Sequence, residues 1–158
     1  LGAEGFGLLM ACLGVGAVAG ALTVGALGAR RPPAAVLFGA AALACAALIA
    51  LSAARGVRLT AALLFLTGLF GLVLVASCNT AMQLAAPDEL RGRVMSLYTL
   101  VWGGVFPFGA FIVGSISEHW GVGRALRVNG VAGLLGVALL LGWWTLRGAP
   151  AWRQRAES

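Results

Sequence analysis

The chain has 158 residues, of which 61% are hydrophobic and 10% are charged, and its formal net charge is +6. A soluble domain of this length cannot bury so much apolar surface in one core, so the composition excludes an ordinary water-soluble fold. The basic residues are all arginines; eight of them lie in pairs between apolar stretches, and the other three lie in the tail. This position indicates membrane headgroups, and not nucleic acid, as the partner of the positive charge.

Five apolar stretches without a single charged residue follow one another along the chain and predict an all-α bundle of five transmembrane helices. A helix needs about 20 apolar residues to cross a bilayer core of about 30 Å, and each stretch meets or nearly meets that length. The predicted spans are residues 5–27, 34–54, 59–86, 94–117 and 128–146, followed by a tail over 147–158.

The distribution of arginines over the loops predicts the orientation of the spans. Seven of the eleven arginines lie in the first loop, the third loop and the tail, and four lie in the other two loops. Positive residues favour the cytoplasmic side, so we expect the N-terminal end outside and the tail in the cytoplasm. Because Leu1 is not a methionine and no signal peptide precedes the first span, we interpret the chain as a fragment of a longer protein.

The first span contains Gly16 and Gly20, and the fourth contains Ala110 and Gly114. Small residues four apart let two helices approach closely in lipid, so both pairs are predicted helix contacts. The second and fifth spans have few polar residues and are expected to face lipid.

The third span is the richest in polar side chains. Asn79 and Gln83 are four residues apart, which puts them on one face of a helix. Two interpretations remain open: the amides contact a transported solute, or they hydrogen-bond a neighbouring helix.

The fourth span carries a proline and three glycines near its midpoint. Proline removes a backbone donor and bends a helix, so this segment is either a fixed kink or a hinge that flexes. The residues concerned are Gly103, Gly104, Pro107 and Gly109. Tyr98 and Trp102 lie just before them and join Asn79 and Gln83 as candidate substrate contacts, which together suit a partly apolar, hydrogen-bonding solute.

The sequence offers little for catalysis. The one histidine, His119, is expected in a loop beside Glu118 and Trp120, away from any nucleophile. Cys12, Cys45 and Cys78 lie singly in the spans and are interpreted as packing residues. We therefore expect no enzyme activity, no metal and no cofactor.

The segment Pro87-Asp88-Glu89-Leu90-Arg91-Gly92-Arg93-Val94-Met95-Ser96-Leu97-Tyr98 and the Gly/Pro-rich span after it resemble the major facilitator superfamily. The resemblance is to its bacterial exporter branch, which includes enterobactin-type siderophore exporters and drug efflux proteins. The start of the chain, from Gly2 to Met10 and from Leu13 to Gly16, is similar to the eighth of that family's twelve helices. Nearly the whole chain then corresponds to helices eight to twelve, and the seventh helix and the N-terminal half would be missing.

The resemblance implies a secondary transporter of the bacterial cytoplasmic membrane that exports a drug-like or siderophore-like small molecule by alternating access. It also implies a cytoplasmic gate of charged residues. The gate positions are Arg30, Arg31, Asp88, Glu89, Arg91 and Arg93, although Ala29 replaces the acid of the family's first-loop motif. The alternative for Asp88 to Arg93 is an ordinary solvated turn.

Two further expectations concern the complete protein. If it is a proton antiporter, its titrating carboxylate must lie in the missing part, because the five spans contain none. The alternative function is a non-transporting five-helix membrane scaffold that anchors a partner complex.

Overall fold

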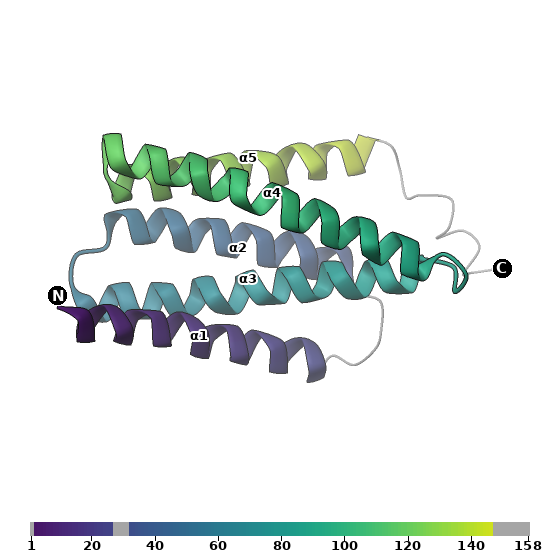
Figure 1. Cartoon of the computed structure of the whole chain (residues 1–158), viewed down its shortest axis with the longest axis horizontal. Coiled ribbons are helices and arrows are strands. Elements are labelled where there is room, and N and C mark those ends of the chain that lie inside the picture. The colour runs from purple at the N-terminus through teal and green to yellow at the C-terminus, as the bar shows by residue number, and fades with distance from the viewer. Residues whose placement is uncertain (1, 27–31, 147–158) are drawn as a thin grey trace.

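The computed structural model describes residues 2–26 and 32–146, and over these residues the chain is a bundle of five α-helices without strands (Figure 1). The helices are α1 (Ala3–Ala26), α2 (Ala34–Ala53), α3 (Val57–Ala85), α4 (Arg91–Trp120) and α5 (Val122–Leu146). All five are long and apolar enough to cross a membrane. The predicted five-helix, all-α architecture is therefore confirmed, while the predicted tail over 147–158 lies outside the described residues.

The helices extend beyond the charge-free spans at several ends. α4 begins at Arg91 and α5 at Val122, so arginines expected in loops lie in the first turns of helices. The expectation that His119 lies in a loop is wrong, because α4 continues to Trp120 and the His119 Nδ1 is 3.0 Å from the Ser115 carbonyl oxygen. The helix ends where Gly121 adopts a φ of 84°, a conformation that glycine reaches without steric cost.

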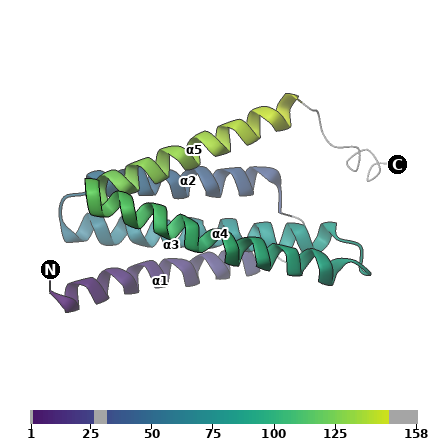
Figure 2. The same ribbon diagram turned by 45° about the horizontal axis from the view of Figure 1, so that its top comes forward.

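Successive helices run in opposite directions. The α2–α3 and α4–α5 connections lie at one end of the bundle, and the α3–α4 connection lies at the other (Figures 1 and 2). α3 contacts α1, α2 and α4, whereas α5 contacts α2 and α4. α2, which the sequence assigns to the lipid-facing side, thus has helix neighbours in both α3 and α5.

Glycines set the two closest helix contacts. A Cβ atom added to Gly16 or Gly20 of α1 would collide with the Phe65 or Leu69 carbonyl of α3, and one added to Gly68 would collide with the Leu13 carbonyl. This confirms the small-residue contact predicted in the first span, where two backbones approach without intervening side chains.

Glycines also make room at the α2–α5 contact, where the space beside them is filled mainly by side chains of α2. A Cβ on Gly130 would lie 2.6 Å from the Ile49 Cγ1, and one on Gly133 would meet the Cys45 Sγ. The small-residue contact predicted in the fourth span is not observed at Gly114, because no described residue lies within 4 Å of a Cβ added there.

α4 is the least covered helix. Over the described chain none of its residues is buried, and large apolar side chains along its middle, such as Leu100 and Phe111, are 71% and 75% exposed. Figure 2 shows α4 crossing obliquely from the end of α3 to the start of α5. Its first turns therefore lie against the C-terminal end of α3.

Candidate functional site

The Asn79 and Gln83 side chains hydrogen-bond to each other near the C-terminal end of α3. The Gln83 Nε2 donates to the Asn79 Oδ1 at 2.6 Å, as the four-residue helical spacing allows. The Asn79 amide NH2 and the Gln83 amide oxygen keep their capacity for further bonds. The alternative expectation, a hydrogen bond from these amides to a neighbouring helix, is not observed among the described residues.

Arg91 connects the first turn of α4 to the last turn of α3. Its Nε donates to the main-chain oxygen of Gln83 at 3.2 Å, and its guanidinium lies 2.6 Å from the Asp88 carboxylate. The last carbonyls of a helix have no partner within the helix, and they carry partial negative charge. An arginine is therefore well suited to cap α3 from the following helix.

The four charges expected in the α3–α4 turn are not equally engaged. Asp88 and Arg91 form the ion pair, whereas Glu89 and Arg93 are exposed and have no ion pair within the described residues. The side chains of Arg91 and Asp88 are 47% and 87% exposed, so their pairing contributes only about 0 to 1 kcal/mol. Arg30 and Arg31, the other predicted gate residues, lie outside the described residues.

Tyr98 and Trp102 form the aromatic part of the candidate site on α4. Their rings stack at a centroid distance of 6.3 Å with an interplanar angle of 18°. Tyr98 is half-buried, and the Trp102 side chain is 52% exposed. Among the described residues no hydrogen bond joins this pair to Asn79 or Gln83, so the structure forms two separate pairs and links α4 to the amide pair through Arg91.

The predicted kink lies within a continuous helix. α4 runs from Arg91 to Trp120 through Pro107, and Cβ atoms added to Gly103, Gly104 or Gly109 would meet nothing within 4 Å. These glycines are thus not required by close packing against the described helices. Of the two interpretations from sequence, a fixed kink that eases packing has no support from these contacts.

Ser77 is a polar residue whose position the sequence did not reveal. Its side chain is 1% exposed, and its Oγ has no hydrogen-bond partner within the described part of the chain. A buried hydroxyl without a partner is unfavourable, and serines in membrane helices usually bond a carbonyl of the preceding turn. The packing of other helices around α3 buries this hydroxyl, and no described residue forms a hydrogen bond with it.

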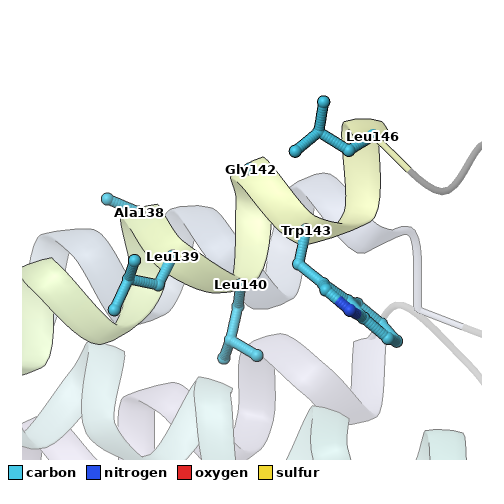
Figure 3. Close-up of a pocket in the computed structure, with 6 residues that line it drawn as sticks. All are labelled: Ala138, Leu139, Leu140, Gly142, Trp143 and Leu146. Atoms are coloured by element: carbon cyan, nitrogen blue, oxygen red, sulfur yellow. The ribbon is translucent and has the colours of Figure 1, made fainter.

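A shallow depression lies along the C-terminal half of α5 (Figure 3). Its lining comes from α5 alone, namely Ala138, Leu139, Leu140, Gly142, Trp143 and Leu146. An open, almost entirely apolar surface of this kind suits lipid acyl chains and lacks the converging polar groups of a solute site. The candidate residues of α3 and α4 are not part of it.

Comparison with known proteins gives one result. A family model described as transmembrane secretion effector matches residues 2–154. Searches of curated proteins and of solved structures found no significant match.

Proposed function

This chain belongs to the transmembrane secretion effector family, a family of the major facilitator type, and is a multi-pass membrane protein of a transporter family. We propose that it works as part of a secondary transporter that exports a small molecule across the bacterial cytoplasmic membrane. In this proposal alternating access moves α4 and its partner helices around a solute held beside α3.

The observation that carries the proposal is a series of polar contacts that meets at Gln83. Its side-chain amide donates to Asn79, and its main-chain oxygen accepts from Arg91, which pairs with Asp88. At one end of this series of contacts, the Asn79 and Gln83 amides keep donors and acceptors that can bind a solute. The other end is a charged turn in water. A displacement of α4 relative to α3 changes the Arg91 contact to Gln83, so solute binding and the position of α4 are coupled through one residue.

The chemistry of these side chains indicates the class of solute. Amides donate and accept neutral hydrogen bonds, and the stacked Tyr98 and Trp102 rings offer a flat apolar surface. No carboxylate lies among these four candidate contacts. A partly apolar solute with hydrogen-bonding groups, drug-like or siderophore-like, fits this combination best.

The excess of arginines in the first loop, third loop and tail supports an orientation with Ala3 outside and the α3–α4 turn in the cytoplasm. Asp88 and Arg91 then form part of a cytoplasmic gate, with Glu89, Arg93, Arg30 and Arg31 as its further members. If export is driven by protons, the titrating carboxylate lies outside the five apolar spans, and we propose that it belongs to a further set of helices opposite α4.

The test is export of a fluorescent dye, ethidium, from cells that express the full-length protein containing this chain. We expect the variant Asn79→Ala/Gln83→Ala to lose at least about tenfold in export rate at unchanged membrane abundance, since two solute hydrogen bonds are removed. The matched control is Asn129→Ala/Thr145→Ala, which removes two polar side chains of α5.

Two results would count against the proposal. Equal export by both double variants would reject Asn79 and Gln83 as solute contacts. Failure of the wild-type protein to export ethidium, a rhodamine dye or a catecholate chelator would favour the scaffold alternative.

A further inference from the structure

Four arginines gather at the end of the bundle opposite the α3–α4 turn. Arg55 lies between α2 and α3, Arg58 is in the first turn of α3, and Arg124 and Arg127 are in the first two turns of α5. All four are exposed. The α2–α3 and α4–α5 connections lie at the same end in both views of the bundle, so these segments are neighbours although they are far apart in sequence (Figures 1 and 2).

Direct contacts hold the start of α5, which carries Arg124 and Arg127, against the end of α2, just before Arg55. The Arg127 Nε donates to the Ser52 Oγ at 3.3 Å, and that hydroxyl donates to the Ile49 carbonyl at 2.6 Å. A Cβ added to Gly123 would lie 3.3 Å from the Ser52 carbonyl oxygen, so the first turn of α5 lies directly on the end of α2. Arg55 follows Ser52 by three residues and lies just beyond the last residue of α2, at the same end of the bundle.

The charge of this surface is not neutralised by the described protein. Neither α3 nor α5 has an acidic residue in its first turn, and the ion pair of the described residues, Arg91 with Asp88, is at the other end of the bundle. Glu118 and Glu4 lie toward this end, but neither forms an ion pair with an arginine in the described part of the chain. The N-terminal ends of α3 and α5 add partial positive charge to the guanidinium groups.

We propose that Arg55, Arg58, Arg124 and Arg127 form a binding site for the phosphate of an anionic phospholipid headgroup. The site lies at the ends of membrane-spanning helices, where headgroups are found, and the forked guanidinium matches phosphate oxygens with paired hydrogen bonds. Trp120, whose side chain is 61% exposed at the adjoining end of α4, has the character of an interfacial aromatic residue. This inference is independent of the transported solute.

The experiment uses the full-length protein in detergent, with native mass spectrometry to measure binding of phosphatidylglycerol and phosphatidylcholine offered in equal amounts. We expect the wild type to prefer phosphatidylglycerol by at least about fivefold, the factor that corresponds to one arginine near an anionic surface. Arg124→Gln/Arg127→Gln should abolish most of this preference. The control Arg91→Gln/Arg93→Gln removes the same charge from the opposite end and should retain it.

Other outcomes distinguish lipid from free phosphate. Excess inorganic phosphate should displace little phosphatidylglycerol, because the lipid chains add apolar contacts that the ion lacks. Complete displacement by inorganic phosphate, or equal affinity for the two lipids, would overturn the assignment. If the α5 double variant does not fold, Arg55→Gln and Arg58→Gln give the same test on exposed side chains. Neither measurement depends on transport, so failure here leaves the proposed export function unaffected.

Discussion

Arg91 and Gln83 are joined across the α3–α4 turn by a hydrogen bond of 3.2 Å from the guanidinium Nε to the main-chain oxygen. The same arginine pairs with Asp88, and the same glutamine donates its side-chain amide to Asn79. One residue of α4 therefore contacts both the charged turn and the end of the helix that carries the amide pair. Any motion of α4 away from α3 has to change this contact.

Replacement of Arg91 by glutamine should have two effects. Loss of the bond to the Gln83 carbonyl should lower the free energy of unfolding by about 1 kcal/mol, because the group is partly exposed. Dye export should fall more than this small loss of stability explains. Arg93→Gln is the matched control, since Arg93 is exposed in the same turn and has no ion pair there. Identical thermal unfolding and export in the two variants would exclude a specific role for Arg91.

Glycines in α1 give a matched pair for the α1–α3 contact. Gly16→Ala introduces a Cβ that collides with the Phe65 carbonyl, whereas the Cβ of Gly14→Ala meets nothing within 4 Å. We expect Gly16→Ala to lower the free energy of unfolding by about 1 to 3 kcal/mol. Gly14→Ala should leave it unchanged or raise it by up to about 1 kcal/mol through helix propensity. Equal denaturation midpoints in detergent would mean that α1 does not pack on α3 in this way.

Replacement of the buried Ser77 should raise the free energy of unfolding, whereas Gly16→Ala should lower it. Ser77→Ala removes a buried polar group that has no partner among the described residues, so the free energy of unfolding should rise by about 1 to 3 kcal/mol. The control Ser96→Ala removes an exposed hydroxyl and should change it by less than about 0.5 kcal/mol. A decrease in stability for Ser77→Ala would indicate that this hydroxyl has a hydrogen-bond partner beyond the described residues.

Pro107 tests whether the middle of α4 flexes. Pro107→Ala restores a backbone N–H that can donate to the Gly103 carbonyl, so α4 should become more stable, by up to about 3 kcal/mol. If the segment is a hinge, dye export should slow at unchanged membrane abundance. Unchanged export in a stabilised variant would establish a fixed kink.

The five helices could be predicted because a bilayer demands a minimum length of uncharged chain, and five stretches meet it. The helix ends could not be predicted equally well. Arg91 and Arg124 lie beyond the apolar spans, where water solvates their charges and nothing prevents the helix from continuing. Charge marks the edge of the hydrocarbon region, and Gly121 with its positive φ marks an actual helix end.

Helical periodicity was sufficient to pair Asn79 with Gln83, and the same spacing of four residues unites Tyr98 with Trp102. It was not sufficient for the contact of Arg91 with the Gln83 carbonyl, which depends on the geometry of the turn between α3 and α4. The sequence also does not show which helices the glycines contact. Lipid is as apolar as a helix interface, so hydrophobicity does not indicate that Gly16 faces α3 and that Gly130 faces α2.

The most direct test of the account is the access of water to the amide face of α3. Asn79→Cys and Gln83→Cys are introduced into full-length protein in which Cys12, Cys45 and Cys78 are replaced by alanine. The reference is Leu139→Cys, at a side chain of α5 that is 74% exposed and apolar in its surroundings. Inverted membrane vesicles are treated with a membrane-impermeant maleimide, which reacts with thiolates in water. The account predicts labelling at positions 79 and 83 that ethidium reduces, and none at 139. Labelling at 79 and 83 no greater than at 139 would contradict a solute pathway along α3.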